Sequence, residues 1–415
     1  MTTPPQPTHN LRVLFASDHP DALSGYSVET KLTALNIRDH CHLALLATFG
    51  LHGSIQDWNG IPLFPGGADA FSNDVIAKAA RLWQADVVIT LKDVMVFNPA
   101  SFQGFRWCPM TPIDHDPSSP EVIERCRVAY RPIAYAPQGF RALRQAGLDP
   151  LYAPHAYDPK VYYPMDRAEA RKVFNIPDDL FIVGTVAVNR GGQPSRKCWN
   201  ENLEAFALFA KDKPNVRYFL HTDVADDRYE AGIPLRRKIA RLGIADKVMF
   251  CDQDRYRYKS GFPHEYMRAF YNSLDVLNAV SMGEGFGIPT LEAQACGTPV
   301  IVGDWCAHED LCWGGWKVLK SEAHGFDDLQ QDGGVFIPQP TAIADRLEKA
   351  YGMLRTEAPA YRALALAGAV PYQIETVVRD HWLPLLAELE KDIRTPRSPG
   401  VLRIIRREEV FPRAA

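Results

Sequence analysis

Two carboxylates stand eight positions apart in the segment GEGFGIPTLEAQACGTPVI, Gly283 to Ile301. Apolar runs of strand character flank this segment on both sides, so its middle is expected to be a helix that joins two strands. Pro289 suits the first turn of such a helix, and Gly297 suits its end. Glu284 is then expected on the loop at the carboxyl end of a strand, and Glu292 about one turn into the helix. Both side chains are expected to face the mouth of the sheet, where carboxylates can bind the hydroxyl groups of a ligand.

The turn around the first carboxylate contains three glycines, Gly283, Gly285 and Gly287. Glycine lets the backbone approach a ligand closely, and the following helix offers unpaired amides and about half a positive charge. These features suit a phosphate, although the glycines alone equally fit an ordinary tight turn. A carboxylate in front of a phosphate is unfavourable unless it binds something uncharged, and sugar hydroxyls are its natural partners. The segment therefore indicates a site for a nucleotide sugar.

The pattern Glu-Gly-Phe-Gly-x-Pro-x-x-Glu, followed by Ala-x-Ala-x-Gly-x-Pro-Val-Ile, resembles the donor-site motif of the retaining glycosyltransferases of family 4. The resemblance implies that Glu284 contacts the transferred sugar and that Glu292 holds the ribose hydroxyls. It also implies that the backbone between them meets the sugar and the phosphate. The donor-binding positions that the resemblance implies in this stretch are Gly285, Phe286, Gly287 and Ile288.

The chain has 415 residues, more than one core usually supports, so two domains are expected. Its net charge of -4 gives no bulk attraction to nucleic acid. The first ten residues lack a charged region followed by an apolar stretch, and no segment approaches the roughly 20 apolar residues that cross a bilayer. Eight cysteines are scattered without a CxxC pair, so we expect reduced thiols. Together these features predict a cytoplasmic protein.

Strand-like apolar runs alternate with helix-like stretches, which predicts an α/β architecture with mostly parallel sheets. The runs form two series, as expected of two facing Rossmann-like domains. A segment rich in proline and aspartate separates the series, so we place the boundary near Asp166. The expected strands are Leu11–Ala16, Cys41–Thr48, Asp86–Leu91, Trp107–Ile113 and Pro132–Ala136 in the first series, and Phe181–Val188, Val216–Thr222, Val248–Cys251, Val276–Val280, Val300–Gly303 and Gly334–Ile337 in the second.

The resemblance to family 4 covers most of the chain and implies the GT-B fold, with the acceptor mainly on the first domain and the donor on the second. Pro154–Pro164 (PHAYDPKVYYP) is similar to the inter-domain segment of the family, with Ala156 where the family often has glycine. The predicted units are residues 1–165 for the acceptor domain, 166–371 for the donor domain, 372–392 for a helix and 393–415 for a tail.

Apolar residues at helical spacing from Tyr372 to Asp392 predict the closing helix, interrupted by Pro384. In the GT-B fold such a helix returns across the cleft to pack on the first domain, and an ordinary closing helix fits the pattern equally well. The tail after it contains six arginines and two glutamates. We expect it to be mobile, and either solvated or in contact with a membrane surface or a partner.

Transfer from a nucleotide sugar expels a diphosphate, whose charge needs cations, amides or a metal. Arg190, Arg196 and Lys197 lie on the loop after the first strand of the second domain. In the resembled family an arginine and a lysine of this loop bind the diphosphate. Lys197 matches the lysine, and for the arginine we favour Arg190 over Arg196, although a charged loop is often merely solvated. Two cations and the helix amides nearly balance the diphosphate, so no metal is expected.

A second carboxylate pair, Asp252 and Asp254, has the Asp-x-Asp spacing that binds manganese in glycosyltransferases of the other main fold. Because the rest of the chain predicts two Rossmann-like domains, we interpret the pair as loop residues near the nucleobase. No metal ligands are assigned.

Three residues at strand ends are candidates on the acceptor side. Gly25 lies in the first loop, where family members carry paired glycines and this chain has only Ser24-Gly25. His115 corresponds to a histidine that family members place near the transferred sugar, and a hydrogen-bonded histidine in a polar turn fits equally. Asp93 could contact acceptor hydroxyls.

The resemblance implies transfer of a hexose-type sugar from a nucleoside-diphosphate sugar to an acceptor hydroxyl, with retention of configuration and with Glu284, His115, Lys197 and Arg190 as catalytic residues. A GT-B sugar-nucleotide epimerase and a non-catalytic binding protein are the alternatives. A nicotinamide-dependent dehydrogenase lacks its glycine motif after the first strand. The base, the acceptor and the oligomeric state stay open; lipid, glycan, protein, small-molecule and nucleic-acid acceptors are all compatible with the sequence.

Overall fold

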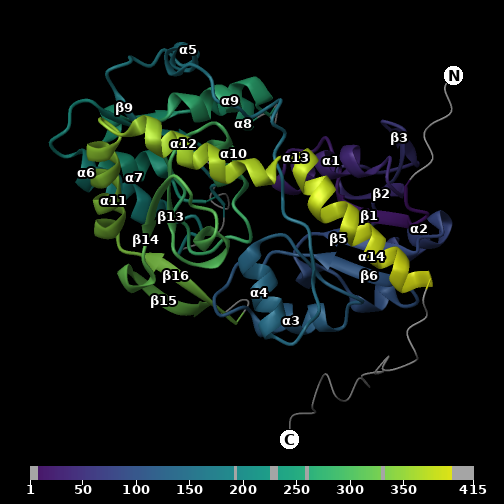
Figure 1. Ribbon diagram of the computed structural model, residues 1–415. Helices are drawn as coiled ribbons and strands as arrows, with labels where there is room; N and C mark the ends of the chain where they lie inside the picture. The colour runs from purple at the N-terminus through teal and green to yellow at the C-terminus, as the bar shows by residue number, and fades with distance from the viewer. Residues whose placement is uncertain (1–7, 191–193, 225–231, 258–260, 329–331, 395–415) are drawn as a thin grey trace, which may run out of the picture.

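The computed structural model describes residues 8–190, 194–224, 232–257, 261–328 and 332–394. These residues form two α/β domains joined side by side, with the last helices crossing from the second domain onto the first (Figure 1). Most of the predicted tail, residues 395–415, lies outside the described residues.

The first domain is built on an eight-stranded sheet with the order β3-β4-β2-β1-β5-β6-β7-β8. Its pairs are parallel except at one edge, where β3 and β4 run antiparallel. The strands are β1 (Arg12–Asp18), β2 (His42–Phe49), β3 (Gln56–Trp58), β4 (Ile61–Phe64), β5 (Val87–Leu91), β6 (Arg106–Met110), β7 (Ile133–Ala134) and β8 (Leu151–Tyr152).

The second domain has a six-stranded, fully parallel sheet with the order β11-β10-β9-β12-β13-β14. Its strands are β9 (Phe181–Val186), β10 (Val216–His221), β11 (Val248–Phe250), β12 (Val276–Asn278), β13 (Val300–Gly303) and β14 (Gly315–Val318). The predicted strand Gly334–Ile337 does not join this sheet. It belongs to β16 (Gly333–Pro338), which pairs antiparallel with β15 (Ala323–Asp328) in a separate hairpin.

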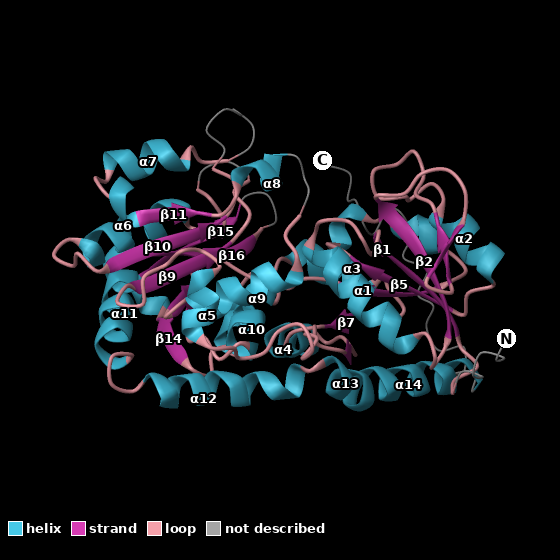
Figure 2. Ribbon diagram, turned by 90° about the horizontal axis from the view of Figure 1, so that it is seen from above, coloured by secondary structure: helices cyan, strands magenta, loops and turns pink. Residues whose placement is uncertain are grey.

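Helices cover both sheets (Figure 2), because the central strands are apolar on both faces. All five residues of β5 are buried, for example, so neither face of that strand tolerates water. The first domain has α1 (Gly25–Ile37), α2 (Ile76–Trp83), α3 (Pro120–Arg127) and α4 (Pro137–Gln145); the second has α5 (Arg167–Lys172), α6 (Trp199–Ala210), α7 (Leu235–Arg241), α8 (Gln253–Arg257), α9 (His264–Ser273), α10 (Ile288–Ala295), α11 (Pro340–Met353) and α12 (Ala358–Ala369).

The chain crosses between the domains twice, and the two crossings are hydrogen-bonded to each other. The Tyr157 amide donates to the Tyr372 carbonyl at 3.0 Å, and the Ile374 amide donates to the Tyr157 carbonyl at 2.9 Å. The second crossing continues through α13 (Ile374–Val377) and α14 (Leu383–Arg394), and Figure 1 shows both lying along the first domain. The return of the closing helix to the first domain is therefore confirmed.

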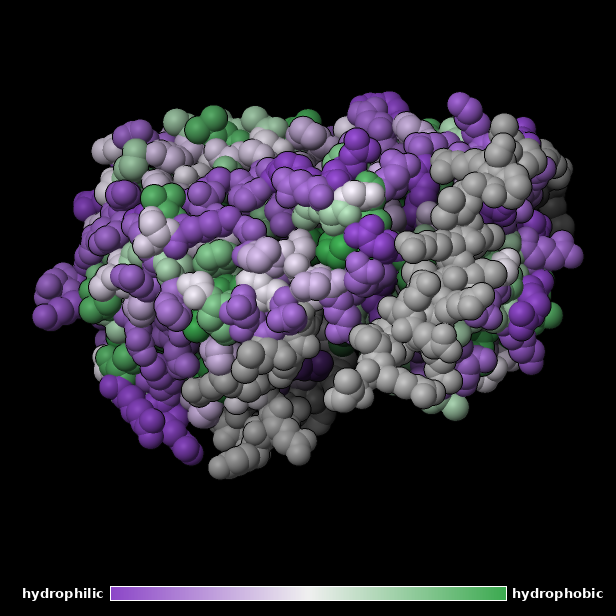
Figure 3. All heavy atoms as spheres, turned by 90° about the horizontal axis from the view of Figure 1, so that it is seen from below, coloured by the Kyte–Doolittle hydropathy of each residue, from purple (hydrophilic) through white to green (hydrophobic). Residues whose placement is uncertain are grey.

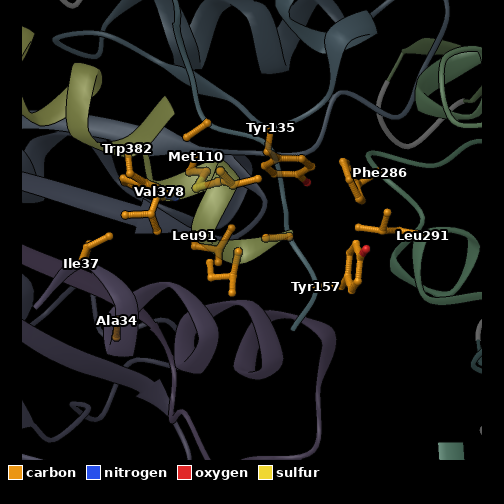
Figure 4. Close-up of a cluster of buried hydrophobic side chains, with 14 of the residues drawn as sticks. Ala34, Ile37, Leu91, Met110, Tyr135, Tyr157, Phe286, Leu291, Val378 and Trp382 are labelled. Carbon is orange, nitrogen blue, oxygen red and sulfur yellow. The ribbon is translucent and has the colours of Figure 1, made fainter. Parts of the chain in front are cut away.

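A π-helical turn, Val378–Trp382, separates α13 from α14 immediately before Pro384. Proline lacks an amide hydrogen and its ring clashes with the carbonyl four residues earlier, so the interruption expected from the sequence has a local cause. The wider turn directs the Trp382 ring onto Phe15 of β1, with 6.4 Å between ring centroids. Figure 4 shows Val378 and Trp382 beside first-domain side chains, in a buried cluster that also includes residues of the second domain.

The surface seen in Figure 3 is mainly hydrophilic, with hydrophobic residues in small separate areas. Such scattered apolar residues are normal on a folded protein. In the described part of the chain, no helix has both the length and the apolar character needed to span a membrane. All eight cysteines are free thiols, and seven of them are buried.

Candidate active site

The predicted strand, turn and helix around the two glutamates are present. Strand β12 ends at Asn278, and α10 begins at Ile288 with Pro289 in its first turn. Gly287 precedes the helix with a φ of 98°, a conformation that side chains disfavour and glycine accepts. Since β12 lies beside β9 in the parallel sheet, the loops after both strands meet at the same edge.

Glu284 is paired with two cations from the loop that follows β9. Its carboxylate accepts a short hydrogen bond from Lys197 and lies 3.4 Å from the Arg196 guanidinium. The same guanidinium donates to the Gly283 carbonyl at 2.8 Å. Glu284 and Lys197 are largely shielded from solvent, whereas half of the Arg196 side chain is exposed. The structure thus joins the sugar-binding candidate to two of the predicted phosphate-binding cations.

These charges determine the ionisation of Glu284. Burial alone would raise its pKa, but the charges of Lys197 and Arg196 outweigh burial and hold the pKa well below its ordinary value. Burial and the neighbouring Arg196 lower the pKa of Lys197, while the Glu284 charge acts in the opposite direction. Glu284 is therefore an anion throughout the neutral range, and its charge is matched locally.

The two candidate arginines differ in their position relative to Glu284. Arg196 lies against Glu284, whereas Arg190 is exposed and has no ion pair within the described residues. Residues 191–193, which lie between the two arginines, are outside the described residues. The geometry therefore favours Arg196, and the preference for Arg190 receives no support from it.

Glu292 has a different environment, although it lies on the same segment. Its side chain is buried in α10, where the Tyr271 hydroxyl of α9 donates to it at 2.6 Å and Tyr162 provides a second hydrogen bond. Burial raises the pKa of Glu292 to about 7 despite both tyrosines, and the carboxylate of Glu29 adds to the rise. No cation is recorded next to Glu292 in the described part of the chain.

The glycines of the turn face the first domain. A Cβ atom on Gly283 would collide with the Asp114 carbonyl oxygen, and one on Gly285 would lie 2.5 Å from the Pro112 Cβ. A Cβ on Gly287 would collide with the His308 ring of its own domain. Gly283 and Gly285 therefore allow the loop after β12 to touch the loop after β6, which is a role that the sequence did not indicate.

Phe286 continues this contact between the domains. Its buried ring lies 5.1 Å from the His155 ring and 6.4 Å from the Tyr135 ring, both measured between centroids. It also lies 6.0 Å from the Tyr372 ring at the second crossing. Figure 4 shows Phe286 and Tyr135 side by side at this junction. The Phe286 side chain thus anchors the turn against the first domain and the second crossing.

His115 contacts the hairpin of the second domain. Its Nδ1 lies 2.9 Å from Asp114 Oδ1, and its Nε2 lies 3.3 Å from Asp328 Oδ2 at the end of β15. Burial lowers the pKa of His115, but the two carboxylates outweigh burial and the net shift is upward. Backbone hydrogen bonds join the next residues of this loop to Gly334 of β16. The structure places His115 in an inter-domain contact.

The remaining acceptor-side candidates lie on the first domain, near residues of the second. Gly25 opens α1, and a Cβ placed on it would lie 3.7 Å from the Ile288 Cδ1. Asp93 accepts a hydrogen bond of 3.0 Å from the Tyr26 hydroxyl. Desolvation and the charge of Asp114 raise the pKa of Asp93, while Arg196 lowers it. Asp93 and Tyr26 of the first domain and Arg196 of the second therefore affect one another's ionisation across the domain boundary.

Several residues of this site were not predicted from the sequence. Asp114 is held near Arg196 and Glu284, whose charges both affect its pKa, and its place before His115 at a strand end was the available signal. Tyr162 and Tyr271 come from segments far from the motif, and no spacing links them to Glu292.

The Asp252 carboxylate accepts a hydrogen bond from the amide of Asp254 at 3.0 Å at the start of α8, so this carboxylate pair has a local structural role.

Residues 186–352 match the family of glycosyl transferases group 1. A D-inositol 3-phosphate glycosyltransferase of Stackebrandtia nassauensis is 32% identical over 152 residues, which cover 36% of this chain and 32% of that protein. A lipopolysaccharide core biosynthesis mannosyltransferase of Rhizobium meliloti, LpsB, is 33% identical over 162 residues, which cover 39% of this chain and 42% of that protein. The chain thus spans about a third to two fifths of the length of these curated relatives.

Two solved structures resemble the whole chain. Sucrose-phosphate synthase of Thermosynechococcus elongatus has a TM-score of 0.65 at 17% identity, covering 93% of this chain and 98% of that one. HepE of Anabaena in complex with UDP-glucose has a TM-score of 0.66 at 17% identity, covering 91% of this chain and all of that one. The chain as a whole therefore has the GT-B fold, and residues 186–352 within it are similar to the glycosyl transferases group 1 family.

Proposed function

We propose that the chain is a retaining glycosyltransferase that moves a hexose-type sugar from a nucleoside-diphosphate sugar to an acceptor hydroxyl without a metal ion. The observation behind this proposal is the contact of Glu284 with Lys197 and Arg196 at the start of α10. The group 1 domain and the relatives named as glycosyltransferases support the reaction class. HepE, which has the same fold, was solved with UDP-glucose, and this supports a nucleotide-sugar donor.

The proposed donor site exchanges one anion for another. In the structure Lys197 and Arg196 are paired with the Glu284 carboxylate. A bound diphosphate competes for the same two cations and for the amides that open α10. Once its cations turn to the phosphates, Glu284 can accept hydrogen bonds from the sugar. The ion pairs therefore keep the site charge-balanced until the donor takes over the positive groups.

The transfer step needs no enzyme nucleophile. The bond between the sugar C1 and the diphosphate oxygen breaks, and its electron pair leaves with the diphosphate. The acceptor oxygen forms a bond to C1 on the face that the diphosphate leaves, and its proton passes to a diphosphate oxygen. The transition state resembles an oxocarbenium ion, so the negative charge of Glu284 stabilises it if the carboxylate lies beside the sugar.

The acceptor side of the proposal uses the first-domain wall. Asp93 and Tyr26 form a hydrogen-bonded pair at the cleft, and such a pair suits an acceptor that presents hydroxyl groups. A catalytic role for His115 stays a prediction, since both ring nitrogens already contact carboxylates. The eight free cysteines fit a reducing compartment, so a cytoplasmic location is part of the proposal.

Thermal unfolding with a panel of UDP-, GDP- and ADP-sugars tests the donor site. A donor at 100 times its Kd should add about 2.7 kcal/mol of stability. NMR of the glycoside formed with the stabilising donor then gives the anomeric configuration. Retention supports the proposed mechanism, and inversion refutes it.

Two controls separate the alternatives. Activity that EDTA abolishes and that magnesium or manganese restores would contradict metal-independent transfer. Conversion of the donor into an epimer without any acceptor would identify an epimerase instead. Binding of the donor with neither hydrolysis nor transfer over long incubation would indicate a binding protein.

A further inference from the structure

The buried pocket of the Glu292 side chain is formed by side chains of α9 and of the inter-domain segment. Tyr271 of α9 donates to its Oε2 at 2.6 Å, and Tyr162 of the inter-domain segment bonds to the same carboxylate. The two tyrosine rings lie 6.0 Å apart at an interplanar angle of 66°, and each hydroxyl has the Glu292 carboxylate as its side-chain hydrogen-bond partner. Glu292 is only 8% exposed, which makes these hydrogen bonds decisive for the orientation of the carboxylate.

A second buried carboxylate acts on this pocket from the first domain. Glu29 of α1 is 2% exposed, and its Oε2 lies 3.1 Å from His155 Nδ1. Its Oε1 is buried without a hydrogen-bond partner among the described residues. The Glu29 carboxylate disfavours a negative charge on Glu292, whereas hydrogen bonds from Tyr271 and Tyr162 favour it. The pocket therefore contains opposing influences on one side chain.

We propose that Tyr271 and Tyr162 are positioning residues that keep Glu292 ionised and oriented for the donor ribose, and that Glu29 opposes them across the domain boundary. This inference depends on the proposed function, because the contact between Glu292 and the ribose comes from the family resemblance. It adds two tyrosines and a first-domain glutamate to the determinants of donor binding. It also makes donor affinity depend on pH near neutrality.

The direction of the pH effect follows from the hydrogen bonds. A carboxylate accepts from both ribose hydroxyls, whereas its protonated form loses part of this capacity. Burial raises the pKa of Glu292 to about 7, so the ionised form is lost as the pH falls through that region. Cys296, one turn further along α10, is a neutral thiol because burial raises its pKa. Donor affinity is therefore high above the Glu292 pKa and falls below it.

The test is the Kd of the most stabilising nucleotide sugar, measured by calorimetry between pH 5.5 and 8.5. Wild-type affinity is expected to fall about tenfold across a midpoint near 7, since charge-assisted hydrogen bonds are about twice as strong as neutral ones. Tyr271→Phe should move the midpoint up by about one unit, because it removes one hydrogen bond to the carboxylate. Glu29→Gln should move the midpoint down, and Glu292→Gln should remove the pH dependence.

Tyr351→Phe is the matched control, because the Tyr351 hydroxyl donates to Asn215 at 3.0 Å on the far side of the second domain. Its midpoint should equal that of the wild type. Equal midpoints in Tyr271→Phe, Glu29→Gln and the wild type would overturn the inference, as would shifts in the same direction. If Glu29→Gln does not fold, Tyr162→Phe replaces it, with an upward shift expected. A wild-type chain that binds no nucleotide sugar refutes the proposed function instead.

Discussion

The two glutamates of the donor turn are the same side chain in opposite electrostatic settings. Glu284 lies against Lys197 and Arg196, which hold its pKa well below the ordinary value. Burial raises the pKa of Glu292 to about 7, although hydrogen bonds from two tyrosine hydroxyls lower it. The first is always charged at neutral pH, and the second is close to its titration point. Spacing in the sequence fixes where the two carboxylates lie, and distant segments determine what each one does.

The origin of the neighbours explains this difference. The cations beside Glu284 come from the loop after β9, which adjoins β12 in the parallel sheet. The tyrosines beside Glu292 come from α9 and from the inter-domain segment. The charge of Glu284 is thus set by residues of the second domain, whereas Glu292 contacts the inter-domain segment and is influenced by Glu29 of α1. Substitutions that treat the two glutamates alike should therefore give unlike results.

The largest expected effect is on turnover. Glu284→Gln removes the charge that stabilises the developing cation and should lower kcat by about 30-fold to 1,000-fold, equivalent to roughly 2–4 kcal/mol. Single-turnover kinetics with the stabilising donor measures the loss. Glu388→Gln is the control, because Glu388 also forms an ion pair, with Arg131, but lies on α14 away from the cleft. Wild-type turnover in Glu284→Gln would refute its assignment.

The second prediction concerns Gly285, which lies between the two glutamates and contacts the first domain. Gly285→Ala places a methyl group 2.5 Å from the Pro112 Cβ, so the domains cannot approach as they do in the structure. Overpacking of this kind costs about 1–3 kcal/mol, and we expect a lower melting temperature and a lower kcat/KM. Gly352→Ala is the matched control, since its Cβ would meet nothing within 4 Å in α11. Equal behaviour of the two variants would contradict the inter-domain role of Gly285.

Glu292→Gln and Glu284→Gln should change the stability of the folded protein in opposite directions. The raised pKa of Glu292 means that its stabilising contribution is complete below the ordinary value of 4.5 and is lost as the pH rises through about 7. The lowered pKa of Glu284 means that its contribution is present above 4.5 and is lost in acid. At pH 8, Glu292→Gln should therefore raise the Tm and Glu284→Gln should lower it, each by roughly 2–4 °C. Calorimetry at pH 8 and pH 5 measures both, and shifts of the same sign at pH 8 would contradict the comparison.

The sequence was sufficient for features that depend on local pattern. The strand, turn and helix around Glu284 follow from apolar runs, glycines and Pro289, and the paired domains follow from two series of such runs. The break before α14 follows from Pro384. These features are encoded by residues close together in the chain.

Features that depend on tertiary contacts could not be predicted from local sequence patterns. The hairpin strand β16 was assigned to the parallel sheet, because an apolar run does not reveal its pairing partner. The contact of Gly285 with Pro112 joins residues far apart in the chain, and glycine spacing alone indicates only a permissive turn. Loop spacing in the sequence favours Arg190 as the phosphate-binding arginine, whereas in the structure Arg196 is the arginine in contact with Glu284, so the role of Arg190 stays a prediction. Strand pairing and side-chain contacts depend on residues that are close in space. The separation of such residues along the sequence follows no fixed rule.

The smallest expected effect is on donor affinity. It distinguishes the two arginines that could bind the diphosphate near Glu284, Arg196 and Arg190. Arg196 contacts Glu284 and Gly283, whereas Arg190 is exposed, so only Arg196 is placed to meet a diphosphate held beside α10. Arg196→Ala should weaken donor binding about tenfold, as expected for one partly exposed charge-assisted hydrogen bond. Arg190→Ala should leave the Kd within about twofold, because surface substitutions change free energies by less than 0.5 kcal/mol. Calorimetric titration of both variants with one nucleotide sugar measures the two Kd values. A larger loss of affinity in Arg190→Ala than in Arg196→Ala would contradict the assignment. It would mean that the loop after β9 rearranges around the donor and that Arg196 pairs with Glu284 only in the ligand-free chain.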